Sequence, residues 1–356
     1  MKTQVLSPSE EAIRLASGIL ADGGLVGFPT ETVYGLGANA FDSKAVLSIF
    51  AAKGRPADNP LIVHIYDTAQ LQELCEVQET AQKLMDAFWP GPLTLLFPKK
   101  EAVPAEVTAG LSTVAVRMPS NPVARSLLRA CGLPIAAPSA NRSGRPSPTT
   151  AAHVLEDMDG IIPLILDGGA CDVGLESTVL DLCHGAPTIL RPGRITKEML
   201  EAVLGTEVAL AGSILRPLKK DEKALSPGMR YRHYAPRGTV TLVEGSEAEV
   251  LSALRLLYQR DLEAGVRACV LCFSEHVPLL SDCQPHDLGS EASSIEVAHG
   301  LFDTLRSLDQ EGMERIYSEV VAPEGVGLAV MNRLGRAAAF RSVKAEEVLK
   351  SDPHKS

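Results

Sequence analysis

Short apolar runs, each closed by glycine, proline or small polar residues, are the feature that most restricts the fold of residues 10–212. The runs are three to six residues long, which is typical of buried strands rather than of helices. They lie at 25–29, 61–66, 94–97, 113–118, 134–138, 163–167, 177–182 and 188–190. One helix is expected before the first run, at 10–20, and helices are expected between only some of the runs, at 121–131 and 149–160. Because strict alternation is absent, we expect an α/β domain with a twisted, mixed sheet.

A more regular pattern begins after residue 238. Strands are expected at 239–244, 266–273 and 315–321, and helices at 246–261, 293–308 and 326–340. This alternation is typical of a Rossmann-like domain with parallel strands. We therefore predict a first domain over 1–212, a second, smaller Rossmann-like α/β domain over 239–345, and a tail at 346–356.

The stretch between these domains, residues 213–238, has a composition of its own. It carries seven Lys or Arg, two Asp or Glu and three Pro, and it lacks apolar periodicity. A solvated tether explains this composition. A basic loop that becomes ordered over an anionic ligand explains it equally well. The sequence leaves open whether this linker is a lid or a tether.

Charge and cysteine usage narrow the class of protein. The chain has 44 acidic against 34 basic side chains, a formal net charge of −10, which argues against a non-specific nucleic-acid binder. It has no apolar run of about 18 residues and no apolar leader after its first residues, so we expect neither a membrane span nor a secretory signal. Seven scattered cysteines indicate reduced thiols and a cytoplasmic protein. Cys269-x-x-Cys272 lies in an apolar stretch and is expected in a buried strand.

The motifs that carry chemistry are polar clusters at expected strand ends. The signatures of P-loop, zinc-protease, serine-hydrolase and kinase sites are absent from the sequence. Instead, the clusters read PTETVYGLG (29–37), KGRPADNPL (53–61), PSANRSGRPSPTT (138–150), GLESTV (174–179) and RPGR (191–194). Strand ends are where α/β proteins place their ligands. The two glycines of 29–37 are expected to allow close approach of the backbone.

Cations are frequent in these clusters. Arg117 interrupts the apolar alternation of 113–118, and a cation there is costly unless it meets an anion. Taken singly, each feature has a structural explanation as a turn, a surface charge or an internal ion pair. Taken together, Lys53, Arg55, Arg117, Arg191 and the further candidate Arg145 indicate a pocket for a nucleoside triphosphate or a carboxylate. No covalent nucleophile stands out, which suits phosphoryl or nucleotidyl transfer.

These motifs, in this order, resemble a known family. Together with WPGPLTLLF (89–97) and VAVRMP (114–119), they resemble the YrdC-like domain of the threonylcarbamoyl-AMP synthases. SPGMRYRHYAP (226–236) and MNRLGRAAA (331–339) resemble the long form of that family, which adds a linker and a Rossmann-like domain. The resemblance implies a nucleotidyltransferase that makes L-threonylcarbamoyladenylate from L-threonine, bicarbonate or CO₂, and ATP, with release of pyrophosphate. It implies Mg²⁺ with the ATP, and a partner complex that modifies the tRNA adenosine next to the anticodon.

The resemblance also implies the site residues. For L-threonine they are Thr32, Tyr34, His64, Arg117, Ser139 and Ser177. For ATP they are Lys53, Arg55, Asn59, Thr113, Asn141, Thr149, Arg191, His233 and Tyr234. Lys53 and Arg55 are expected to be catalytic, by stabilising charge on the phosphoryl oxygens. The general base and the metal ligands are not indicated.

Two other functions stay open at this point. An RNA-binding module would use the same basic surface, although the net charge and the 4% aromatic content count against it, and no stable nucleic-acid binding is expected. A carbamoyltransferase of the hydrogenase-maturation kind would need further cysteine pairs. The role of the C-terminal domain, the oligomeric state and the surface that hands over the product are not indicated by the sequence.

Overall fold

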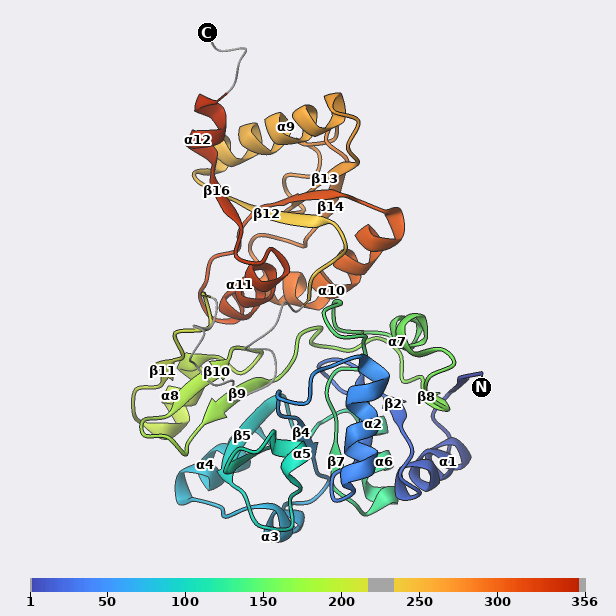
Figure 1. Cartoon of the computed structure of the whole chain (residues 1–356). Helices are drawn as coiled ribbons and strands as arrows, with labels where there is room; N and C mark the ends of the chain where they lie inside the picture. The colour runs from blue at the N-terminus through green and yellow to red at the C-terminus, as the bar shows by residue number, and fades with distance from the viewer. Residues whose placement is uncertain (1, 217–233, 352–356) are drawn as a thin grey trace. The chain divides into compact units, whose positions relative to one another are not determined.

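The computed structural model describes residues 2–216 and 234–351, in which two compact units can be distinguished. One unit comprises residues 2–143 and 147–216, and the other comprises residues 144–146 and 234–351. Figure 1 shows mixed helices and strands in both. The predicted fold class, a mixed-sheet α/β domain with a second, smaller α/β domain, is confirmed.

The first unit is organised around a mixed sheet with the order β1-β8-β2-β3-β7-β4-β6-β5-β9-β10-β11. Its strands are β1 (Gln4–Leu6), β2 (Val26–Phe28), β3 (Gly35–Asn39), β4 (Ile62–His64), β5 (Leu93–Pro98), β6 (Thr113–Arg117), β7 (Ile135–Ala136), β8 (Leu164–Leu166), β9 (Thr178–Asp181), β10 (Thr188–Arg191) and β11 (Ala209–Leu210). Strand β6 pairs parallel with β4 and antiparallel with β5. Each short apolar run of the sequence therefore contributes one strand, and sheet order separates strands that are close in sequence.

Helices flank this sheet. They are α1 (Glu10–Ala21), α2 (Ser43–Lys53), α3 (Leu71–Leu74), α4 (Glu79–Phe88), α5 (Ala105–Thr108), α6 (Pro122–Cys131), α7 (Ala151–Met158) and α8 (Lys197–Leu204). Helices α1 and α6 lie side by side (Figure 1) and bury Leu20 and Leu127 in a shared core. Helix α1 begins after Ser9, whose hydroxyl accepts a hydrogen bond from the amide of Ala12 over 3.1 Å and so caps the first turn.

Some elements of the first unit were not predicted, among them β3 and α2. Strand β3 contains Gly35 and Gly37, which break its apolar pattern. A Cβ atom on Gly37 would lie 2.9 Å from the ring of Phe28, so these glycines make room for an internal side chain rather than for a ligand. Helix α2 has little sequence periodicity but good ends: Asp42 caps its first turn and Gly54, with φ of +60°, ends it.

The second unit has a five-stranded parallel sheet with the order β14-β13-β15-β12-β16. Its strands are β12 (Thr239–Glu244), β13 (Ala268–Cys272), β14 (Pro285–Asp287), β15 (Arg315–Ser318) and β16 (Ser342–Lys344). Its helices are α9 (Glu247–Glu263), α10 (Ser294–Glu311), α11 (Val326–Ala337) and α12 (Ala345–Lys350). Helices α9 and α12 cover one face of the sheet, and α10 and α11 cover the other (Figure 1). Cys269 and Cys272 are buried in β13, as predicted.

The second unit also contains a short piece of the motif 138–150. The amide of Ala235 donates to the carbonyl of Gly144 over 2.9 Å. The Nη2 atom of Arg306, on α10, donates to the carbonyl of Pro146 over 2.7 Å. The second unit thus holds this segment by its backbone.

Among residues 2–216 and 234–351, no helix is both long enough and apolar enough to cross a bilayer.

Candidate active site

A row of polar residues runs across the sheet of the first unit. His64 on β4 pairs in register with Arg117 on β6, and Arg117 pairs in register with Thr94 on β5. Thr94 in turn lies opposite Val179 of β9, which lies opposite Arg191 of β10. Laterally paired residues share one face of a sheet. The register therefore brings His64, Arg117, Thr94 and Arg191 onto one face, although they come from distant parts of the chain.

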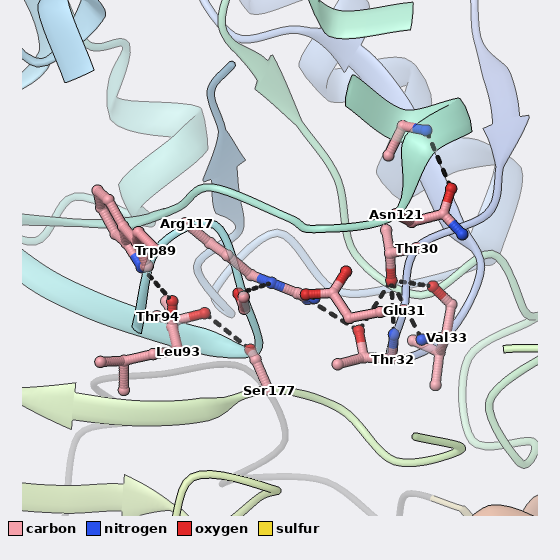
Figure 2. Close-up of polar contacts among 12 residues, drawn as sticks. Thr30, Glu31, Thr32, Val33, Trp89, Leu93, Thr94, Arg117, Asn121 and Ser177 are labelled. Atoms are coloured by element: carbon pink, nitrogen blue, oxygen red, sulfur yellow. Dashed lines mark hydrogen bonds and ion pairs between the residues drawn. The ribbon is translucent and has the colours of Figure 1, made fainter. Parts of the chain in front are cut away.

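Arg117 lies at the centre of this row and is only 3% exposed. Its Nη1 atom donates to the hydroxyl of Thr32 over 2.8 Å, and its Nε atom donates to the carbonyl of Gly91 over 3.2 Å. Its Nη2 atom lies 2.6 Å from Oε1 of Glu31 (Figure 2). The anion required by a buried cation at this position is thus Glu31, which the sequence analysis did not single out.

The turn that carries Glu31 is held by Thr30. The Thr30 hydroxyl donates to the carbonyl of Val33 over 2.6 Å and accepts from the amides of Thr32 and Val33. It also lies 2.8 Å from the hydroxyl of Thr32 (Figure 2). These contacts rigidify residues 30–33. They fix Glu31 and Thr32 on the same side of the Arg117 guanidinium.

Ser177 connects the row to Arg191. The Ser177 hydroxyl lies 2.7 Å from that of Thr94. Arg191 donates twice to Ser177, from Nη2 to the hydroxyl and from Nε to the carbonyl, each over 3.0 Å. All three side chains are buried. The structure therefore brings together Ser177 and Arg191, which the resemblance assigns to different substrates.

His64 is buried against the ring of Phe28. One ring nitrogen, Nδ1, lies 3.2 Å from the carbonyl of Ile62. Burial, and next the positive charge of Arg117, lower the pKa of His64 to about 3. The imidazole is therefore neutral at pH 7 and contributes no positive charge to the site.

Lys53 joins helix α2 to the loop that contains Ser139 and Asn141. It is 4% exposed, and its Nζ atom donates to the carbonyl of Ser139 and, over 2.5 Å, to the carbonyl of Asn141. The Ser139 hydroxyl donates to Oδ1 of Asn141 over 2.6 Å. The amide of Ser143 donates back to the carbonyl of Lys53 over 2.9 Å. Lys53 thus orders the loop from which two candidate ligand-binding side chains project.

Asn59 lies close to Arg55 in the motif 53–61. The Nη2 atom of Arg55 donates to the carbonyls of Asn59 and Pro60, each over 3.2 Å. The Asn59 side chain is completely buried, and neither polar atom of its amide has a hydrogen-bond partner among the described residues. Buried polar atoms are nearly always paired. An unpaired amide at this position supports the expectation that a ligand completes it.

The remaining predicted residues of the first unit are buried as well. Thr113 begins β6 opposite Pro98. Thr149 precedes α7, and its hydroxyl lies 3.4 Å from Nδ1 of His153. The Tyr34 hydroxyl donates to the carbonyl of Gly169 over 2.7 Å and its pKa is raised by burial, so this group is already committed to the backbone.

Three predicted residues lie outside the described part of the first unit. His233 lies outside the described residues. Tyr234 belongs to the second unit, where its ring stacks on Phe302 and lies beneath Arg333. Arg145 also belongs to the second unit, with Nη2 3.9 Å from Oδ2 of Asp309.

Sequence reasoning missed Glu31, Thr30 and Thr94. Glu31 and Thr30 lie within the quoted motif 29–37, and Thr94 within 89–97. The available signal was the unexplained cation Arg117, which demanded a carboxylate somewhere in the site. Nothing in the spacing indicated which carboxylate it was.

Comparison with known proteins agrees with this site. Residues 18–193 match a family model described as telomere recombination, and residues 195–339 match one described as threonylcarbamoyl-AMP synthase, C-terminal domain. The threonylcarbamoyl-AMP synthase of Bacillus subtilis is 47% identical over 344 residues, which is 96% of this chain and 97% of that protein. The chain belongs to the threonylcarbamoyl-AMP synthase family. It is therefore an enzyme of the nucleotidyltransferase kind.

Other relatives of this family extend the comparison. The Pyrococcus abyssi synthase is 47% identical over 336 residues, covering 94% of this chain and 96% of that protein. The crystal structure of P. abyssi Sua5 complexed with L-threonine matches with a TM-score of 0.89 and 46% identity, covering 96% of this chain and 98% of that chain. The structure of a doubly substituted variant of P. abyssi Sua5 matches with the same TM-score and 44% identity over the same shares. Both units of this chain therefore belong to the long form of the family.

Proposed function

We propose that this enzyme makes L-threonylcarbamoyladenylate from L-threonine, bicarbonate or CO₂, and ATP, and releases pyrophosphate. The observation that carries the proposal is the buried Arg117 guanidinium, which Gly91 and Thr32 hold in one position. A planar guanidinium is the side chain best suited to a carboxylate such as that of threonine. The relative crystallised with L-threonine, 46% identical to this chain, supports the same ligand.

The threonine site would be centred on Arg117. Its carboxylate-binding guanidinium is accompanied by the hydroxyls of Thr32 and Ser177, which can orient the other polar groups of the amino acid. His64 would contribute a neutral ring beside them. Ser139 and Tyr34 complete the proposed set, with Tyr34 acting through the backbone of 168–169 rather than through a free hydroxyl.

The ATP site would be formed by the residues that the resemblance assigns to ATP, of which Arg191 also belongs to the polar row. The proposed residues are Lys53, Arg55, Asn59, Thr113, Asn141, Thr149 and Arg191, with His233 and Tyr234 from the linker end. The unpaired amide of Asn59 supports this placement, because a buried hydrogen-bonding group without a partner is suited to a polar ligand. The closing of His233 and Tyr234 over the nucleotide is a prediction.

The proposed reaction has two steps. In the first, the α-ammonium of threonine loses a proton to water, and the resulting neutral amine adds to the carbon of CO₂ and releases a second proton to water, giving a carbamate. In the second, a carbamate oxygen attacks the α-phosphorus, a new P–O bond forms, and the bond to pyrophosphate breaks. Fixed cations lower the barrier of such a step by stabilising charge that develops on the phosphoryl oxygens. Lys53 and Arg55 are proposed to do so, and the loop contacts of Lys53 position Asn141 at the same time.

Mg²⁺ is proposed to enter with ATP as part of the substrate. The described part of the chain holds no cluster of three His, Cys, Asp or Glu side chains suited to a metal ion. Magnesium is commonly held by substrate phosphates with few protein ligands. The phosphates of ATP would therefore supply most of the ligands of this Mg²⁺.

The product would be passed to a partner complex that transfers the threonylcarbamoyl group to the adenosine next to the anticodon of a tRNA. We expect no stable direct binding of nucleic acid by this chain. The cytoplasm is the proposed compartment, which is supported by seven cysteines that are all free thiols.

Pyrophosphate release tests the proposal directly. The full chain is incubated with Mg·ATP, to which L-threonine and bicarbonate are added singly and together, and labelled bicarbonate is followed into an AMP-linked product. Release that needs both co-substrates, with label in the adenylate, is the expected result. Release that ignores threonine, or no labelled adenylate, would overturn the proposal. RNA affinity measured against salt would then be the next experiment, since phosphate contacts weaken as salt rises.

A further inference from the structure

Glu31 has a hydrogen-bonding capacity that the folded chain does not use. Its side chain is buried, with 5% of the residue exposed. Within residues 2–216 and 234–351, neither carboxylate oxygen makes a well-aligned hydrogen bond. Its one charged contact there is the 2.6 Å approach of Oε1 to Nη2 of Arg117 (Figure 2). A carboxylate offers about four acceptor sites, so this one is far from satisfied.

The neighbouring guanidinium has the complementary deficit. Nε and Nη1 of Arg117 donate to Gly91 and Thr32, but Nη2 has no well-aligned acceptor in the described part of the chain. Oε1 of Glu31 and Nη2 of Arg117 thus contact each other over 2.6 Å, while Oε2 of Glu31 has no hydrogen-bond partner among the described residues. A buried ion pair is stable only when hydrogen bonds satisfy its remaining capacity. The pair is therefore built to be completed by a ligand that brings both kinds of group.

The charge of the pair selects the class of ligand. A simple carboxylate would satisfy Arg117, but it would bring a second negative charge against Glu31. A zwitterion brings a carboxylate for Arg117 and an ammonium for Glu31, and the buried site keeps its charges balanced. Like charges brought together in a poorly solvated site repel strongly. The Thr30 contacts hold Glu31 in place on this side of Arg117.

We propose that Glu31 is the residue that binds the α-ammonium group of the amino-acid substrate and thereby restricts the site to zwitterionic amino acids. The inference rests on the proposed function, because it assigns one group of the proposed threonine site. Carboxylate and guanidinium then bind the two charged groups attached to one carbon atom.

The test compares two ligands on two chains. L-Threonine and 3-hydroxybutyrate, which is threonine without its amine, are titrated into the full-length wild type and the Glu31→Gln variant by calorimetry. The variant should bind threonine about ten- to hundredfold more weakly, the value of one charge-assisted hydrogen bond. It should bind 3-hydroxybutyrate as well as the wild type or better, because a like charge has been removed. A damaged site would weaken both ligands together.

Two further variants complete the design. Glu106→Gln removes a carboxylate that accepts from Ser43 on α2, and it should leave the ratio of the two affinities unchanged. If Glu31→Gln does not fold, Glu31→Asp replaces it, because this change keeps the charge but shortens the side chain by one methylene. The ratio of the affinity for threonine to the affinity for 3-hydroxybutyrate should then fall at least threefold. An unchanged ratio in the variant that folds would overturn the inference alone. A wild type that binds no threonine would overturn the proposed function together with it.

Discussion

The Nζ atom of Lys53 donates a hydrogen bond to the backbone carbonyl of Asn141 over 2.5 Å, across 88 positions of sequence. It also donates to the carbonyl of Ser139. Lys53, the last residue of α2, therefore holds the loop that follows β7 by hydrogen bonds to its backbone. The ammonium therefore orders the loop, and we propose that it also supplies a positive charge to the nucleotide site.

Replacing this cation should reduce turnover strongly. Lys53→Met is expected to lower threonine-dependent pyrophosphate release by about 10²–10³-fold, as the removal of one preorganised charged donor does elsewhere. Lys44→Met, an exposed lysine of the same helix, is the matched control and should change little. A Lys53→Met chain with unchanged turnover would remove Lys53 from the catalytic set. Hydrogen exchange of residues 139–143, expected to speed up in the variant, shows whether the loop has been released.

Asn59 is expected to favour ligand binding at the expense of stability. Because its buried amide has no partner among the described residues, Asn59→Leu is expected to raise the free energy of unfolding by about 1–3 kcal/mol. The same change should raise the KM for ATP about tenfold, the loss of one hydrogen bond of roughly 1.4 kcal/mol. Denaturant unfolding of an Asn59→Leu chain that is less stable than the wild type would contradict this account.

Asn121 is the matched control for Asn59. Its side chain accepts from the amides of Val123 and Ala124 at the start of α6, so its hydrogen bonds are made within the chain. Asn121→Ala should lose about 0.5–2 kcal/mol of stability, the value of a helix cap, without changing the KM for ATP.

The low pKa of His64 makes the stability of the protein depend on pH. The group has a pKa of about 3 in the folded chain and 6.5 in its ordinary state, so between these values the unfolded chain binds the extra proton. The contribution of the neutral His64 side chain to the free energy of unfolding is fully present above pH 6.5 and is lost as the pH falls toward 3. Its slope is about 1.4 kcal/mol per pH unit within this window. His64→Asn should flatten the acid limb of the curve by this amount, measured by denaturant unfolding at several pH values. The exposed His299→Gln should follow the wild type, and equal slopes in all three chains would refute the assignment.

Arg306 of the second unit holds the backbone of the segment 144–146, and this contact can be tested. It is 1% exposed, and its Nη2 donates to the carbonyl of Pro146, between Asn141 and Thr149 in the sequence. Arg306→Met should lower the free energy of unfolding by roughly 1.5–3 kcal/mol, the value of a hydrogen bond to a charged group. Amide exchange over 142–149 should become faster, and the KM for ATP should rise. The exposed Arg341→Met is the control. Unchanged exchange over 142–149 would show that the Arg306 contact does not order this segment.

The element-level predictions succeeded where the signal is local. The apolar runs that form β4, β6 and β8 are short and are bounded by glycine, proline or polar residues. Runs of this length and composition are typical of buried strands. Strand β3 was not predicted because two of its five residues are glycines, which carry no hydrophobic signal. Their reason, the ring of Phe28 across the strand pair, is a tertiary contact.

The site shows the same division. Arg117 could be recognised as a cation in need of an anion, because the cost of burying an unpaired charge depends only on burial. Its partner could not be recognised, because Glu31 is far from Arg117 in sequence and reaches it only through sheet order and the turn held by Thr30. The role of Lys53 was expected to be electrostatic, and its contacts with the 139–141 backbone add a structural one.

By itself the sequence determined the fold class, the position of most strands and the chemical character of the site, since apolar periodicity, capping and the cost of burying a charge are local properties. Only the tertiary structure decided which residues meet. The register of β4, β6 and β5 places His64, Arg117 and Thr94 in one row, and this pairing of distant strands depends on packing over the whole sheet. The pairing of Glu31 with Arg117 follows from the same packing.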